Sequence, residues 1–192
     1  MTNQSAEACQ VAWRLNKTIV MVGMMGAGKT AVGTQLARDL GVGFLDSDEE
    51  IVRAANLSVA EIFERYGEPF FREKEARVLA RLLDGPAGVL STGGGAFLHA
   101  GNRALIHERG VSVWLKADLP LLWARVRHKT TRPLLRTPDP KATLSSMYEA
   151  RVPVYALADL AVEAQPDYSI DEMAGRVAEA LVAHRPDVLE RI

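Results

Sequence analysis

Hydrophobic residues occur in short runs that alternate with stretches of helical character. Thr18–Val22, Gly88–Ser91 and Val111–Leu115 have the length and composition of buried strands, and Gly43–Leu45 and Leu160–Val162 are weaker candidates. Each of the three stronger runs is followed by a segment that is compatible with a helix. Because this alternation is typical of a parallel sheet covered by helices, the pattern predicts an α/β fold.

The segments between these runs predict helices and one irregular region. The expected helices cover Lys29–Leu40, Asp48–Ala55, Val59–Arg65, Phe71–Leu83, Ala100–Glu108, Pro120–Arg127, Ala142–Leu157 and Ile170–Ala183. The stretch His128–Pro140 resists assignment, because three prolines and mixed charge interrupt any helix. We expect it to be a loop on the surface.

Length and composition narrow the class of protein. A chain of 192 residues is long enough for one compact domain, expected over residues 17–192, and residues 1–16 are mostly polar and predict a loosely held extension. The net charge of −1 predicts no general affinity for nucleic acid, and no stretch approaches the roughly 20 apolar residues that span a bilayer. A single cysteine, Cys9, excludes an intramolecular disulfide, so a cytoplasmic location is the default expectation.

The most specific motif is a phosphate-binding loop. Gly23 to Thr30 fill every fixed position of the pattern G-x-x-x-x-G-K-[ST], directly after a predicted strand and before a predicted helix. Its glycines permit backbone conformations that wrap a polyphosphate, Lys29 supplies positive charge and Thr30 offers a hydroxyl group to Mg²⁺. The whole context fits nucleoside triphosphate binding far better than a plain glycine-rich turn.

Two acidic residues follow the second strand candidate. Asp46 and Asp48 lie where open α/β sheets place their ligands, so one could support a metal ion while the other engages a hydroxyl acceptor. A helix N-cap at Ser47 or Asp48 would produce the same pattern. Taken alone, the motif favours neither interpretation.

Further candidates are charged residues and glycines spread along the chain. Arg72 and Glu75 are spaced to form an i,i+3 pair that could clamp a carboxylate, although an exposed salt bridge is the favoured interpretation of the pair alone. Gly93, Gly94 and Gly95 end a strand, and their entropic cost favours close approach of a ligand over a tight turn.

Ser91 and Thr92 stand where many NTPases carry a metal-binding acid, so Mg²⁺ would depend more on Thr30 and Asp46. Cations also gather around the unassigned loop, between Arg125 and Arg136. A closing lid could bring such an arginine onto the γ-phosphate, although an ordinary solvated basic loop is favoured for the cluster alone. Arg151 could add a cation for an anionic substrate, or be a surface residue.

In this order and spacing, the motifs closely resemble the shikimate kinase family. They are the phosphate loop, Asp46-x-Asp48, Phe71-Arg72-x-x-Glu75, Gly93-Gly94-Gly95, Arg132-Pro133-Leu134-Leu135 and Arg151-x-x-x-Tyr155, and the likeness covers about residues 13 to 183. The resemblance implies a three-layer α/β/α phosphate-loop kinase with a five-stranded parallel sheet of order 2-3-1-4-5 and a mobile lid at about residues 126–140. It also implies transfer of the ATP γ-phosphate to the 3-hydroxyl group of shikimate during aromatic amino acid biosynthesis.

The resemblance further implies a role for each motif. The catalytic residues would be Lys29, Asp48 and Arg132. ATP would contact Gly26, Ala27, Gly28, Lys29, Thr30, Ala31, Arg125 and Arg132, and Mg²⁺ would be held by Thr30 and, through water, by Asp46. Shikimate would contact Asp48, Arg72, Gly93, Gly94, Gly95 and Arg151. The expected partners are ATP and shikimate, without nucleic acid or membrane, and the expected state is a monomer.

Two alternatives stay open at the level of the sequence. A phosphate loop does not name its acceptor, so a related kinase acting on gluconate or another hydroxy acid would share many of these features. A regulator that binds nucleotide without turnover is a second alternative, which the retention of Lys29, Thr30, Asp46, Asp48 and Arg132 disfavours.

Overall fold

The computed structural model describes residues 12–128 and 135–192, and its centre is a five-stranded parallel sheet. In spatial order the strands are β3 (Phe44–Asp46), β4 (Val89–Ser91), β2 (Thr18–Val22), β5 (Gly110–Lys116) and β6 (Leu160–Glu163). Numbering these five strands alone along the chain gives the order 2-3-1-4-5, so the predicted topology is confirmed.

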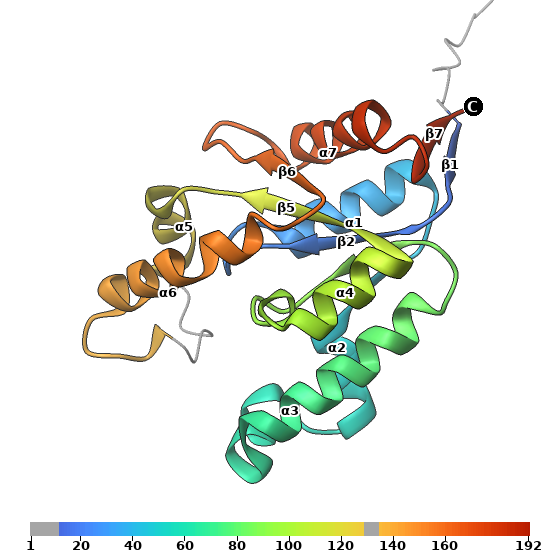
Figure 1. The fold of residues 1–192 in the computed structure, drawn as a ribbon. Coiled ribbons are helices and arrows are strands. Elements are labelled where there is room, and N and C mark those ends of the chain that lie inside the picture. Colours follow the sequence, from blue (N-terminus) through green and yellow to red (C-terminus); the bar gives the residue numbers. More distant parts are fainter. Residues whose placement is uncertain (1–11, 129–134) are drawn as a thin grey trace, which may run out of the picture.

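Helices cover both faces of this sheet (Figure 1). They are α1 (Lys29–Leu40), α2 (Ser47–Ala55), α3 (Val59–Leu83), α4 (Ala100–Arg109), α5 (Leu119–Val126), α6 (Pro140–Tyr155) and α7 (Ile170–His184), with a short 3₁₀ helix, η1 (Ala96–Leu98). Helices α1 and α7 pack together on one face, and α4 lies against β5 on the other, next to α3. The three-layer α/β/α arrangement is the predicted one.

The central strand of the sheet, β2, is entirely buried. All five residues of β2 are buried, because helices cover both faces and leave no side for water. On α1, a Cβ atom at Gly33 would lie 2.9 Å from the Phe44 ring, so glycine lets this helix approach the sheet closely. The phosphate loop is therefore held between a buried strand and a closely packed helix.

Helix α3 differs from the prediction. The two expected helices, Val59–Arg65 and Phe71–Leu83, are joined in one span that is interrupted at Gly67, whose φ of 79° is left-handed. Together with α2, this region has a small core of its own around Ile51, Ile62, Phe71 and Val78. Gly67 and Pro69 are residue types that disfavour a continuous helix, and here the helix bends at a kink instead of ending in a loop.

A second, two-stranded sheet was not predicted. Strand β1 (Trp13–Leu15) pairs antiparallel with β7 (Leu189–Arg191), at the end of the molecule away from α5 and α6 (Figure 1). The expected loose extension over residues 1–16 is therefore wrong for residues 13–15, and residues 1–11 lie outside the described part. Three-residue strands carry too little hydrophobic periodicity to be recognised. Among the described residues, no helix is both long and apolar enough to cross a membrane.

Candidate active site

The phosphate loop connects β2 to α1 with a backbone that only glycine adopts easily. Gly23, Gly26 and Gly28 have φ values of 137°, 83° and 98°, and Gly28 is the N-cap of α1. The Lys29 ammonium group donates hydrogen bonds to the Gly23 oxygen at 2.8 Å and to the Met24 oxygen at 3.1 Å. The loop thus curls around its own lysine, with the N-terminus of α1 facing the same space.

Oxygen atoms gather beside the start of α1. Thr30 Oγ1 donates to Asp46 Oδ2 at 3.2 Å and lies 3.4 Å from Ser91 Oγ. The other oxygen of Asp46 accepts from the backbone N–H of Asp48 at 2.9 Å and caps α2. The expected N-cap is therefore present, but it is Asp46 rather than Ser47 or Asp48, and support of a metal ion by Asp46 stays a prediction.

These oxygen atoms are donors of the kind that Mg²⁺ prefers. Within residues 12–128 and 135–192, no cluster of three histidine, cysteine, aspartate or glutamate side chains could hold a metal by itself. A divalent ion here would need the Thr30 hydroxyl group, a single carboxylate, water and the phosphates of a nucleotide. Such a sparse protein contribution is common for Mg²⁺, which keeps several waters.

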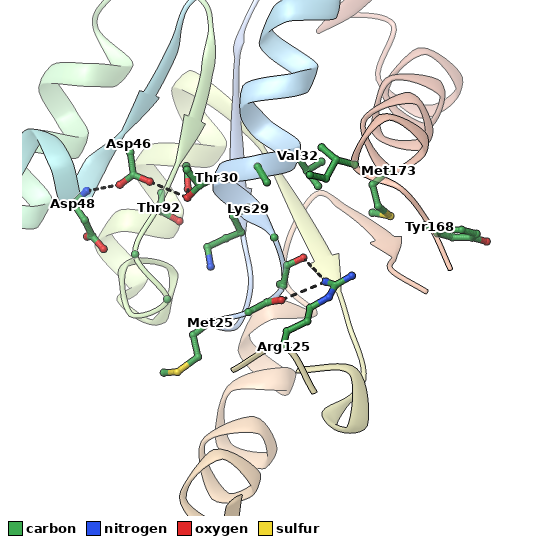
Figure 2. A pocket seen from close by; sticks show the side chains of 18 of the residues that line it. Met25, Lys29, Thr30, Val32, Asp46, Asp48, Thr92, Arg125, Tyr168 and Met173 are labelled. Atoms are coloured by element: carbon green, nitrogen blue, oxygen red, sulfur yellow. Dashed lines mark hydrogen bonds between the residues drawn. The ribbon is translucent and has the colours of Figure 1, made fainter. Parts of the chain in front are cut away.

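Asp48 lies in the first turn of α2, beside the phosphate loop. Figure 2 shows it at one end of the cavity, with Lys29 between it and Arg125. Its Oδ1 atom is buried and has no hydrogen-bond partner among the described residues. Burial, together with the carboxylates of Asp46 and Glu75, raises the pKa of Asp48 to about 6, while Lys29 and Arg72 oppose the shift. A buried carboxylate oxygen without a partner is costly, so the site is built to receive a donor.

The three consecutive glycines each face a different charged side chain. A Cβ atom at Gly93 would lie 2.7 Å from Asp48 Oδ1, and one at Gly95 would lie 2.6 Å from an Arg72 nitrogen. At Gly94 the nearest atom would be an Arg151 nitrogen, at 3.4 Å. None of the three has a positive φ. Their role is therefore to leave room for these side chains, which also makes a simple tight turn an insufficient explanation.

Arg72 is held by two acidic residues of its own helix. It donates to Glu75 at 2.9 Å and to Glu68 at 3.2 Å, and the Glu75 side chain is only 1% exposed. Burial raises the pKa of Glu75, although the Arg72 guanidinium group lowers it. The exposed salt bridge that the sequence favoured is thus wrong for this pair. The contribution of Glu68 was missed, because the predicted helix began at Phe71 and left Glu68 outside it.

A cavity of about 500 Å³ lies along the phosphate loop, Asp48 and the first two glycines of the turn. Arg72, Gly95 and Arg151 are not among its lining residues. Its lining residues are Met25, Gly26, Ala27, Gly28, Lys29, Thr30, Ala31, Val32, Asp46, Asp48, Ser91, Thr92, Gly93, Gly94, Arg125, Tyr168, Ser169, Ile170 and Met173. The Arg125 guanidinium group donates to the Gly26 and Ala27 oxygens at 3.3 and 3.2 Å (Figure 2). All of the expected ATP-contacting residues within the described range therefore meet at one cavity.

The far end of this cavity was not assigned to the site from the sequence. Tyr168 and Met173 lie opposite Asp48 in Figure 2, beyond the Arg125 side chain. The only local signal was the helix start at Ser169, where a capping box with Glu172 opens α7. Arg132, the expected lid arginine, lies outside the described residues.

The sequence of this chain is similar to a family model and to known proteins that carry the same name. The family model "Shikimate kinase" matches residues 25–182. A shikimate kinase from Cereibacter sphaeroides is 70% identical over 94% of this chain and 90% of that relative, and one from Ruegeria pomeroyi is 67% identical over 92% and 90%. These matches extend over nearly the whole chain, including every described element of the cavity.

The solved structures agree with the sequence comparison. A shikimate kinase from Acinetobacter baumannii in complex with shikimate superimposes with a TM-score of 0.83 at 37% identity, covering 88% of this chain and 94% of that one. Family match, identity and fold therefore lead to one conclusion: the chain belongs to the shikimate kinase family, the kinases that phosphorylate shikimate with ATP.

Proposed function

We propose that the cavity holds ATP along the phosphate loop and shikimate beside the three glycines, and transfers the γ-phosphate to the 3-hydroxyl group. The observation that carries this proposal is the close fit of Gly93, Gly94 and Gly95 against one carboxylate and two guanidinium groups. A cyclic acid with neighbouring hydroxyl groups needs both kinds of partner. This acceptor end opens directly onto the phosphate loop through Asp48 and Lys29.

At the phosphate end, the chain supplies charge and donors. Lys29 would exchange its contacts with the loop carbonyls for the β- and γ-phosphates, and the backbone N–H groups of the loop would face the same oxygens. Thr30 and Asp46 are the residues that would hold Mg²⁺, which in kinases neutralises charge on the phosphates. Arg125 would lie over the adenine, and Arg132 would reach the transferring phosphate.

At the acceptor end, Asp48 has the chemistry to orient the attacking hydroxyl group. Its partnerless oxygen would accept a hydrogen bond from that group, and its pKa of about 6 leaves it ionised at neutral pH but able to take up a proton. Arg72 and Arg151 would bind the shikimate carboxylate as guanidinium donors. The rate enhancement then comes from positioning and charge rather than a covalent intermediate.

The deciding experiment compares acceptors for Mg-ATP-dependent ADP release. Shikimate, quinate, gluconate and no acceptor are assayed, with Lys29→Ala prepared identically as a control for contaminating kinases. We expect strong turnover with shikimate alone, loss of turnover in the control, and severe impairment in Asp48→Asn. Turnover with gluconate would overturn the acceptor, and near-normal turnover in Asp48→Asn would remove that residue from the site.

Three expectations stay predictions alongside this proposal. They are a requirement for Mg²⁺ among divalent ions, a monomeric state and a cytoplasmic location. Metal dependence of ADP release and the mass of the protein in solution test the first two directly. ATP binding without ADP release in the presence of shikimate would favour the nucleotide-binding regulator instead.

A further inference from the structure

Tyr155 is a fully buried tyrosine whose hydroxyl group reaches the active site. It is the last residue of α6, and its side chain is 0% exposed. The hydroxyl group donates a hydrogen bond of 2.5 Å to the Gly94 oxygen, 61 residues away in the sequence. Buried tyrosines normally find some partner for the hydroxyl group. Here that partner is the middle residue of the glycine turn at the acceptor end.

The ring of Tyr155 is fixed from the other side. It stacks on Trp114 of β5, with ring centroids 6.2 Å apart and 28° between the planes. Trp114 in turn borders the phosphate loop, because a Cβ atom at Gly23 would lie 3.2 Å from its ring. The hydroxyl group therefore has a defined position relative to both ends of the cavity.

Holding one carbonyl group orients a whole peptide unit. The Gly94 oxygen and the Gly95 N–H belong to the same planar trans peptide and point in opposite directions. Three glycines in a row have few steric limits on their backbone, so without a fixed partner the turn would sample many conformations. The Tyr155 hydroxyl group supplies that partner.

The same hydroxyl group also contacts Arg151, one helical turn earlier. Burial raises the pKa of Tyr155, which keeps it protonated as a donor, and the Arg151 guanidinium group opposes the shift through its charge and a hydrogen bond. Both groups lie against Gly94, since a Cβ atom there would be 3.4 Å from an Arg151 nitrogen and 3.7 Å from the Tyr155 oxygen. One hydroxyl group thus connects the arginine to the glycine turn.

We infer that Tyr155 is a positioning residue for the acceptor, whose hydroxyl group holds the Gly94 carbonyl and Arg151 in the arrangement that receives the substrate carboxylate. This inference rests on the proposed acceptor site. Tyr155 acts through these two groups and does not itself touch the reacting atoms. Its removal should therefore weaken acceptor binding and leave ATP binding nearly intact.

The test is the variant Tyr155→Phe, which removes the hydroxyl group and keeps the buried ring. Tyr148→Phe is the matched control, because Tyr148 lies on the same helix, partly buried against the main core and outside the cavity lining. We expect the KM for shikimate to rise about tenfold in Tyr155→Phe, the KM for ATP to stay within about twofold, and both constants to stay unchanged in the control.

The split between the two KM values separates positioning from stability. Partial unfolding lowers the concentration of active enzyme and hence the maximal rate, but leaves both KM values unchanged. A second set of variants tests whether Tyr155 acts through Arg151. Arg151→Ala should raise the KM for shikimate. In the double variant Arg151→Ala/Tyr155→Phe, the further rise caused by Tyr155→Phe should be clearly smaller than tenfold. A fully additive effect would overturn the action of Tyr155 through Arg151.

Other outcomes are equally decisive. An unchanged KM for shikimate in Tyr155→Phe, or equal rises for both substrates, would overturn the inference, whereas wild-type protein without shikimate-dependent turnover would overturn the proposed function instead. If Tyr155→Phe does not fold, NMR of the native protein labelled with ¹³C-carbonyl glycine replaces it. We then expect shikimate to shift the Gly94 carbonyl and Tyr155 hydroxyl resonances together, and no shift would overturn the inference.

Discussion

The phosphate end and the acceptor end of the site are built in different ways. The phosphate end comes from eight consecutive residues, Gly23 to Thr30, and its geometry depends on left-handed glycines. The acceptor end combines Asp48, Arg72 and Arg151 from three distant segments, packed against Gly93–Gly95 with no left-handed backbone. The phosphate end therefore depends on backbone conformations that favour glycine, and the acceptor end depends on the room that the missing glycine side chains leave for charged groups.

Because of this difference, substitutions at the two ends should affect different kinetic constants. At the phosphate end, donors and charge act on the group that is transferred, so their loss should lower kcat. At the acceptor end, Arg72, Arg151 and the glycines would hold a part of the substrate that does not react, so their loss should mainly raise KM. Asp48 is the exception, because it would face the attacking hydroxyl group.

The largest effect is expected for Lys29→Ala. Losing the only side-chain cation in the loop itself should lower kcat by about 1000-fold or more, while the dissociation constant for shikimate changes little. Rapid-quench kinetics and a shikimate binding titration measure the two quantities. Lys17→Ala, at an exposed ion pair with Asp187, is the control. A comparable loss of shikimate binding would show that the two ends do not act separately.

Arg72→Ala should raise the KM for shikimate by about 100-fold with a smaller change in kcat, because a held guanidinium group is lost and Glu75 stays buried without its partner. Arg132→Ala should show the reverse split if that residue serves the transferring phosphate. Steady-state kinetics with both substrates varied measure both. Arg77→Ala, on the same helix and 70% exposed, controls for loss of surface charge. Equal effects of the first two variants on KM alone would contradict these roles.

Gly95→Ala tests whether space is the reason for the glycines. The added methyl group would meet the Arg72 guanidinium group at 2.6 Å and push it out of place, so we expect a rise of about tenfold in the KM for shikimate. Gly101→Ala is the matched control, because nothing lies within 4 Å of its Cβ position. A normal KM in Gly95→Ala would mean that Arg72 adjusts freely.

The pH dependence of kcat/KM for shikimate should report on Asp48. With a pKa of about 6, the carboxylate is half ionised at pH 6, and kcat/KM should fall about tenfold for each further pH unit downward. Kinetics between pH 4.5 and about pH 8 measure the profile. A plateau that extends well below pH 6 would contradict an acting Asp48 carboxylate with a raised pKa.

The smallest effect concerns stability. Because burial raises the pKa of Asp48 from 3.8 to about 6, protonation stabilises the fold fully below pH 3.8, and this stabilisation is lost as the pH rises through 6. At pH 7.5 the free energy of unfolding of Asp48→Asn should therefore exceed that of the native protein by at most about 3 kcal/mol, and its melting temperature should be higher. Both differences should be smaller at pH 4. Calorimetry without Mg²⁺ or nucleotide measures this. Equal melting temperatures at pH 7.5 would contradict a strained carboxylate.

The sequence predicted the local part of the molecule most completely. Helix α1 begins and ends at the predicted residues, since a strand, a glycine loop and a glycine C-cap at Gly41 bound it in sequence. The phosphate loop was predicted equally well, because the residues that form it are consecutive in the sequence. Short β1 and β7, by contrast, depend on the pairing of segments about 175 residues apart.

The acceptor end could be predicted only through family resemblance. Spacing alone could not show that Glu75 is buried, which converts an ordinary helix pair into a fixed clamp for Arg72. Tyr155 was named only as part of the motif shared with the family, and its contact with Gly94, 61 residues away, could not be predicted. Burial and long-range contacts, rather than residue type, give these side chains their function.

Asp46 divides its two oxygens between two tasks. One oxygen starts helix α2, which carries Asp48, and the other accepts the Thr30 hydroxyl group beside the phosphate loop. A mutation that spares only one task must distinguish between two atoms of a single carboxylate, which asparagine does and alanine does not. Alanine at this position would therefore remove the Thr30 contact and the cap of the helix that carries Asp48 at the same time.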